Sequence, residues 1–229
     1  MKLIVLSDTH GLLRQEVLDR LSPAPDAILH GGDINNEGIL KTLSSIAPVR
    51  VVRGNNDKEW AEAIPLTLEE ELGGIRVFMT HKKRDLPPDL SPYDLVVYGH
   101  SHRYEEQRLG NTVLLNPGSC GPRRFNQAIT MAAVTVTMTA EGRPEITVTR
   151  IDIEHTPTRK IKAAPDDLKR MVETVMRETR RGRTVLTIAS GHGWDATLVE
   201  QIARLYVTHP GVTVDGILGK LELLEALPN

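Results

Sequence analysis

The sequence of 229 residues predicts an α/β protein whose parallel or mixed sheet is covered by helices. Short apolar runs that end in polar loops alternate with segments of helical period. Two longer segments rich in Thr, Val and Ile then flank the turn-like sequence Glu141-Gly142-Arg143-Pro144. Finally, the composition changes near His155. We therefore expect two parts, a main domain over residues 1–155 and a small α/β appendage over residues 156–229.

The expected strands of the main domain share one pattern, because each is a short apolar run followed by polar or glycine-rich residues. They are Lys2–Leu6, Ala27–Leu29, Val49–Val52, Ile75–Thr80, Asp94–Tyr98 and Val113–Leu115. Apolar residues at helical spacing predict helices over Leu12–Leu21 and Glu37–Ile46. Partial alternation in Ala128–Met138 and Glu145–Ile153 predicts an antiparallel hairpin. In such sheets the active site lies beyond the carboxyl ends of the strands.

The appendage begins with a predicted linker, Thr156–Pro165, which contains prolines and basic residues. A charged helix is expected over Asp166–Arg181 and a short strand over Thr184–Ile188. Two amphipathic helices should follow, over Trp194–Val207 and Gly216–Leu227. We expect the appendage to serve self-association, giving a homo-oligomer, or to cover the pocket of the main domain.

The composition excludes several classes of protein. A formal net charge of −2 argues against general nucleic-acid binding, and an aromatic content of 3% leaves few surfaces on which single strands could stack. Cys120 is the only cysteine, so no disulfide can form within the chain. The sequence has no apolar run of the roughly 20 residues needed to cross a bilayer, and its start lacks the pattern of a signal peptide. We therefore expect a cytoplasmic protein that does not bind membranes.

Seven side chains with metal-binding chemistry follow the expected strands. They are Asp8, His10, Asp33, Asn55, His81, His100 and His102. Imidazoles mixed with carboxylates and an amide suit Mn, Fe, Co, Ni or Zn. The Asp-x-His and His-x-His spacings place both members of a pair on the same side of extended chain. Two such pairs could serve two metal ions, with Asp33 bridging them, and two cations can hold a hydroxide and clamp a phosphate.

Each motif alone also has an ordinary structural interpretation. Asp8-x-His10 could be a cap or a surface pair, and Asn55-Asn56 is typical of a turn. The combination is more specific, because all the pieces fall at expected strand ends within the first 102 residues.

The ordered motifs resemble those of the calcineurin-like metallophosphoesterases. The motifs are Asp8-x-His10, Gly32-Asp33, Gly54-Asn55-Asn56-Asp57, Thr80-His81 and Gly99-His100-Ser101-His102. Together with Asn116-Pro117-Gly118-Ser119, they are most similar to the small bacterial and archaeal phosphodiesterase group, the YfcE-like proteins. The resemblance covers about residues 1–153. It implies a β-sandwich of two mixed sheets flanked by helices, and a dinuclear metal-dependent phosphodiesterase acting on a small phosphate ester.

The resemblance also implies roles for the seven side chains. Asp8, His10 and His102 would bind the first metal ion, while Asn55, His81 and His100 would bind the second. Asp33 would bridge the two ions. A metal-bridging hydroxide would then attack phosphorus in line, which makes Asp33, Asn55 and His81 the candidate catalytic residues. Manganese is the expected metal, with Fe, Ni, Co and Zn as alternatives.

This sequence departs from the family pattern at two loops. Many larger members carry a histidine after the ligand asparagine, where it is thought to protonate the leaving group, but here that residue is Asn56, which cannot act as an acid at neutral pH. His81 is followed by Lys82-Lys83-Arg84, where relatives usually have glycine. Lys82 is therefore a candidate substrate-binding residue with Asn55 and Asn56, although a solvated basic loop is an equal alternative. A phosphomonoesterase, a dinucleotide pyrophosphohydrolase and a non-catalytic scaffold of the same fold also remain open.

Overall fold

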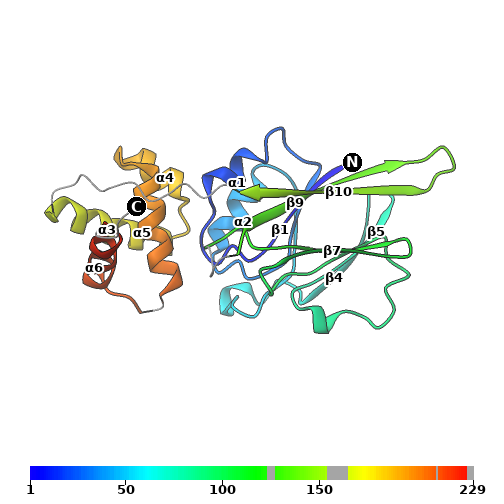
Figure 1. Cartoon of the computed structure of the whole chain (residues 1–229), viewed down its shortest axis with the longest axis horizontal. Helices are drawn as coiled ribbons and strands as arrows, with labels where there is room; N and C mark the ends of the chain where they lie inside the picture. Colours follow the sequence, from blue (N-terminus) through cyan, green and yellow to red (C-terminus); the bar gives the residue numbers. More distant parts are fainter. Residues whose placement is uncertain (123–126, 154–164, 210, 226–229) are drawn as a thin grey trace.

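The computed structural model describes residues 1–122, 127–153, 165–209 and 211–225, and its main part is built from two mixed five-stranded sheets (Figure 1). The first sheet has the order β10-β9-β1-β2-β3, in which β1, β2 and β3 are parallel and β9 and β10 antiparallel. Its strands are β1 (Lys2–Leu6), β2 (Ala27–His30), β3 (Val49–Val51), β9 (Ile129–Met138) and β10 (Pro144–Ile153). The predicted hairpin is therefore confirmed.

The second sheet has the order β4-β5-β6-β8-β7, with β5, β6 and β8 parallel and the two outer strands antiparallel. Its strands are β4 (Thr67–Leu72), β5 (Ile75–Thr80), β6 (Leu95–Val97), β7 (Tyr104–Leu109) and β8 (Thr112–Pro117). Two short 3-10 helices, η1 (Glu59–Ala61) and η2 (Lys83–Asp85), lie in the connections. The expected sandwich of two mixed sheets is confirmed.

Alternating side chains of β1 divide the core into two layers. Leu3 and Val5 pack between the two sheets. Ile4 and Leu6 point to the other face, where they pack under the short helices α1 (Gln15–Asp19) and α2 (Glu37–Ser44). This packing leaves the carboxyl ends of the parallel strands at one edge of the sandwich.

Four helices follow the sandwich and lie at one end of the molecule, beside α1 and α2 (Figure 1). They are α3 (Pro165–Arg180), α4 (Val185–His192), α5 (Ala196–Thr208) and α6 (Val214–Glu225). They enclose a core of their own, into which Leu12 of the main domain inserts. The three helices predicted in this part are therefore present, although residues 226 and 227 of the last one lie outside the described residues.

The strand predicted over Thr184–Ile188 is wrong, because this segment begins α4. Thr184 caps the helix by accepting a hydrogen bond from Thr187 N at 3.2 Å. Val185, Ile188 and Ala189 are buried at helical spacing. A short apolar run cannot be assigned by periodicity alone. The described part of the C-terminal segment is consequently helical rather than α/β.

Other differences concern segments whose signals are short or charged. The helix expected over Leu12–Leu21 is confined to Gln15–Asp19. Strands β4 and β7 were not predicted, because their sequences TLEEEL and YEEQRL carry mostly charged and polar residues at the exposed edges of the second sheet. The predicted linker Thr156–Pro165 lies outside the described residues apart from the first residue of α3. No helix in the described ranges is long and apolar enough to cross a membrane.

Candidate metal centre

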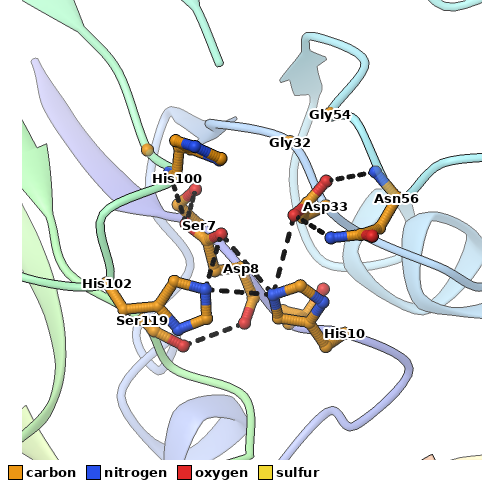
Figure 2. A network of polar contacts seen from close by, with 12 residues as sticks. Ser7, Asp8, His10, Gly32, Asp33, Gly54, Asn56, His100, His102 and Ser119 are labelled. Atoms are coloured by element: carbon orange, nitrogen blue, oxygen red, sulfur yellow. Dashed lines mark hydrogen bonds and ion pairs between the residues drawn. The ribbon is translucent and has the colours of Figure 1, made fainter. Parts of the chain in front are cut away.

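Six of the seven predicted side chains meet at the carboxyl ends of the parallel strands. Figure 2 shows Asp8, His10, Asp33, His100 and His102 among them. They come from the loops that follow β1, β2, β5 and β6, which end at the same edge of the sandwich. Their candidate ligand atoms form two groups, and within each group all of them lie within 4.8 Å of one another. The groups are Asp8, His10 and His102, and Asp33, His81 and His100.

In the first group, two imidazoles face one buried carboxylate. Nε2 of His10 and Nε2 of His102 lie 3.1 Å apart. They approach Asp8 Oδ1 to 3.6 Å and 3.2 Å, respectively. Oδ1 is buried and has no hydrogen-bond partner in the described part of the chain. Two imidazole nitrogens and an unpartnered carboxylate oxygen at these separations are a suitable set of donors for one divalent cation.

Asp33 joins this group to the second one. Its Oδ2 lies 3.7 Å from Nε2 of His10 and 3.4 Å from Nε2 of His81. Nδ1 of His81 lies 2.7 Å from the carbonyl oxygen of Gly31 and donates to it, so Nε2 faces Asp33 and is the nitrogen that could bind a cation. A carboxylate oxygen shared by one histidine of each group is suited to bridging two cations.

The pKa values of the two buried aspartates suit the binding of cations. Burial would raise the pKa of Asp8, but the adjacent imidazoles of His10 and His102, together with the charge of His102, hold it well below its usual range. For Asp33, burial is likewise outweighed by the adjacent, positively charged imidazole of His81 and by the hydrogen bonds from Asn56, and its pKa falls to about 2. Both carboxylates are consequently ionised at neutral pH. A cation placed between them would compensate two buried negative charges.

The backbone conformation of the loops directs these side chains toward one another. Asp8, His10, Asp33, His100 and His102 all have φ between 44° and 70°. This left-handed region is uncommon for residues other than glycine, and it costs on the order of 1 kcal/mol or more at each position. Five such residues in one small volume indicate that the loops are held in place for the side chains they carry.

The comparison with known families agrees with this geometry. The family model described as the calcineurin-like phosphoesterase superfamily domain matches residues 1–139. The chain belongs to this superfamily. The calcineurin-like domain therefore includes β1 to β9 and all six of these candidate metal ligands.

Curated relatives of this chain include archaeal and bacterial proteins. A protein of Methanothermobacter thermautotrophicus named probable metallophosphoesterase is 33% identical over 135 residues, which are 50% of this chain and 74% of the relative. Phosphodiesterase YfcE of Escherichia coli K12 is 31% identical over 155 residues, 56% of this chain and 84% of YfcE. A crystal structure of a Vps29 mutant from Entamoeba histolytica aligns with a TM-score of 0.52 at 20% identity, covering 67% of this chain and all of Vps29. This last likeness concerns the fold alone.

Asn55, the seventh predicted ligand, lies in the same region but is exposed. The structure records no hydrogen bond from its side chain to another described residue. Its neighbour Asn56 contacts the carboxylate of Asp33 instead, donating from N to Oδ1 at 2.8 Å and from Nδ2 to Oδ2 at 2.7 Å. The role of Asn55 as a metal ligand stays a prediction.

Sequence reasoning missed the structural role of Asp57. Its Oδ1 accepts hydrogen bonds from the backbone N of Ile34 at 2.8 Å and of Asn35 at 2.7 Å, while Oδ2 accepts one from Gly54 N at 2.8 Å. Burial raises the pKa of this carboxyl, and the backbone N–H groups of Asn35 and Gly54 act in the opposite direction. The side chain thereby ties the loop after β2 to the loop after β3. An aspartate in a loop that can accept several backbone N–H groups is the signal that could have found it.

Replacement of Asp57 by Ala should destabilise the protein, because three buried or partly buried backbone donors would lose a charged acceptor. We expect the free energy of unfolding to fall by about 3 kcal/mol, measured by urea denaturation of the metal-free protein. Asp89→Ala is the matched control, since this exposed carboxylate accepts a hydrogen bond from Ser91 N. Equal unfolding midpoints for the two variants would contradict the role assigned to Asp57.

His30 is buried beside the metal centre but supports the loops. Gly32 N donates to its Nδ1 at 3.1 Å, so its Nε2 carries the proton that faces Thr9 Oγ1, also at 3.1 Å. Burial lowers its pKa to about 3, which keeps the ring neutral. Both ring nitrogens are thus occupied by the loops after β1 and β2.

The two lysines of the basic loop after β5 differ in their contacts. Lys83 forms an ion pair with Glu105 at 2.5 Å, while Lys82 is half-buried near the centre. Burial lowers the pKa of His100, and the charges of His81 and Lys82 lower it further. Within the described residues, Lys82 has no carboxylate within 4.0 Å, so its positive charge near His100 is not compensated by an ion pair.

Proposed function

We propose that this protein is a dinuclear metal-dependent phosphodiesterase. The observation that carries the proposal is the position of Asp33 Oδ2, within 4.0 Å of a histidine nitrogen from each group of candidate ligands. Membership of the phosphoesterase superfamily and the similarity to phosphodiesterase YfcE support it. We assign manganese as the working metal, since the set of imidazoles and carboxylates suits that ion among others.

The donor set fits two cations, because it offers unpartnered buried atoms as well as the required residue types. Oδ1 of Asp8 and Nε2 of His81 are both buried without a hydrogen bond from any described residue. Asp8, His10 and His102 would hold one ion, and Asn55, His81 and His100 the other, with Asp33 between them. Two bound cations would supply a hydroxide nucleophile at neutral pH and neutralise charge on the phosphate oxygens.

Residues of this chain would orient the ester and would determine which leaving groups depart readily. Lys82 places an uncompensated positive charge beside His100, where it can attract the phosphate. Asn56 is committed to Asp33 by two hydrogen bonds and has no proton to give an alkoxide. Esters with acidic alcohols should therefore be cleaved faster than esters of ordinary alcohols.

A metal-restoration assay tests this function. Protein stripped with a chelator should be inactive toward bis-p-nitrophenyl phosphate and should recover when Mn²⁺ is added, while elemental analysis reports about two ions per chain. Hydrolysis of p-nitrophenyl phosphate, a monoester, should be slower under the same conditions. Turnover that survives exhaustive chelation would refute the mechanism. Faster monoester cleavage would identify a phosphomonoesterase, and two bound ions without turnover would identify a scaffold.

A further inference from the structure

A cleft of about 320 Å³ lies between the metal centre and the C-terminal helices. One side is lined by His10 and Asn35 of the main domain, and the other by Arg180 at the end of α3 and Tyr206 of α5. Its volume is within the range of small-molecule sites. The family model ends at residue 139, so both helices lie beyond the residues it matches. The cleft thus combines a candidate metal ligand with side chains from outside the matched domain.

The helices that form this wall are held against the main domain by specific contacts. Asn36 caps α2 and also donates from Nδ2 to the carbonyl oxygen of Thr179 at 2.9 Å. Arg14, which is buried, forms an ion pair with Glu200 of α5. Leu12 packs into the core of the C-terminal helices. These contacts lie next to the loop that carries His10, so they fix the wall relative to the metal centre.

Close backbone packing adds to this placement. A Cβ added to Gly38 would lie 2.3 Å from the carbonyl oxygen of Gly182, which directly follows α3 and Arg181. Only a glycine at position 38 permits this approach without a shift of the backbone. The end of α3, where Arg180 is located, is therefore anchored on α2.

Arg180 carries a positive charge into the cleft. Its Nε donates to Tyr206 Oη at 3.1 Å, and its guanidinium carbon lies 5.9 Å from the centre of the tyrosine ring. The neighbouring Arg177 and Arg181 each pair with Glu178 at 3.1 Å. Arg180, by contrast, has no carboxylate within 4.0 Å among the residues that the structure describes. An exposed guanidinium that is oriented by a tyrosine and lacks an acidic partner is suited to binding phosphate or carboxylate.

We propose that Arg180 and Tyr206 form a subsite for a second anionic group of the substrate. The proposal rests on the phosphodiesterase function proposed above. It narrows the substrate class to organic phosphodiesters that carry a further phosphate or carboxylate on one of the two esterified groups. The scissile phosphate would sit at the metal centre, and the additional anion would lie in the cleft against Arg180. The C-terminal helices would then select the substrate of the domain they cover.

Two esters that differ by a single phosphate group test the proposal. Thymidine 5′-(p-nitrophenyl phosphate) with a 3′-phosphate should be hydrolysed with a higher kcat/KM than the same ester without it. Arg180→Gln should reduce this preference about tenfold, a usual effect of losing one charge-assisted contact. Arg180→Lys should restore part of it. Arg181→Gln, which removes a neighbouring arginine paired with Glu178, should leave the preference unchanged. Equal loss for both esters, or no preference in the unmodified protein, would overturn the subsite.

A direct binding measurement tests the subsite independently of the proposed phosphodiesterase activity. Calorimetry of thymidine 3′,5′-bisphosphate should show affinity for the full chain that falls about tenfold in Arg180→Gln and is unchanged in Arg181→Gln. A carboxylate analogue of the 3′-phosphate in the same assay would show which of the two anions is preferred. Arg180-dependent binding without hydrolysis of any ester would support the subsite and refute the phosphodiesterase. Hydrolysis of bis-p-nitrophenyl phosphate with binding that ignores Arg180 would do the reverse.

Discussion

Asp33→Asn is expected to reduce kcat/KM for bis-p-nitrophenyl phosphate by about a thousandfold, which corresponds to roughly 4 kcal/mol of transition-state stabilisation. The reason is the position of the carboxylate, whose Oδ2 approaches Nε2 of both His10 and His81. An amide in this place carries no charge and can present only one oxygen. Cations on both sides would lose their shared negative ligand. We therefore also expect fewer than two bound ions per chain by elemental analysis.

The substitution keeps the shape of the side chain, which allows loss of chemistry to be distinguished from loss of fold. An asparagine oxygen at position 33 can still accept the hydrogen bond that Asn56 N donates to Asp33 Oδ1. Far-ultraviolet circular dichroism should be unchanged. Asp152→Asn is the matched control, because this exposed carboxylate on β10 pairs only with Arg150 in the described structure and should leave turnover intact. Turnover within tenfold of the unmodified protein in Asp33→Asn, with two ions bound, would exclude the bridging role.

The sequence predicts the fold well where hydrophobic pattern and turn chemistry agree. The strand Ile75–Thr80 has the predicted bounds because an apolar run is buried between other strands and ends at a polar loop. The edge strand Thr67–Leu72 could not be found in this way, since its exposed residues are Thr67, Glu69 and Glu71 and it is defined by pairing with β5. The segment after Thr184 shows the opposite error, because a strand is predicted there and a helix is found. Its β-branched residues suggest a strand, but a capping hydroxyl and packing against the other C-terminal helices make it helical.

The metal centre is predictable to the extent that it depends on residue type and strand ends. Six side chains at the ends of apolar runs meet because parallel strands end at one edge, a rule that requires no distances. The left-handed backbone at residues such as Asp8 and His102 has no signal in sequence, because it is imposed by the surrounding loops. The cleft at Arg180 could not be predicted from the sequence either. It exists only because two distant segments, α3 and the loop of Asn36, pack against each other.

The second large effect is expected at Gly54, where the loop after β3 crosses the loop that carries Asp33. A Cβ at this position would lie 2.1 Å from Asp33 N and 2.2 Å from Asp33 Oδ1. Most of this contact is with backbone, so the loops themselves must move apart. Gly54→Ala should lower the free energy of unfolding by about 3 kcal/mol, the upper end for an overpacked site. Displacement of Asp33 should also lower kcat/KM about a hundredfold, as a misplacement near 1 Å commonly does.

Gly191→Ala is the control that isolates this steric effect from the general consequences of replacing glycine. Gly191 lies in α4, and an added Cβ there would meet nothing within 4 Å. Since alanine favours helix over glycine by about 1 kcal/mol, this control should be as stable as the unmodified protein or slightly more stable. Urea denaturation and the bis-p-nitrophenyl phosphate assay provide both measurements. If Gly54→Ala matched Gly191→Ala in both, the two loops would have to tolerate separation, and the close crossing that positions Asp33 would not be needed for function.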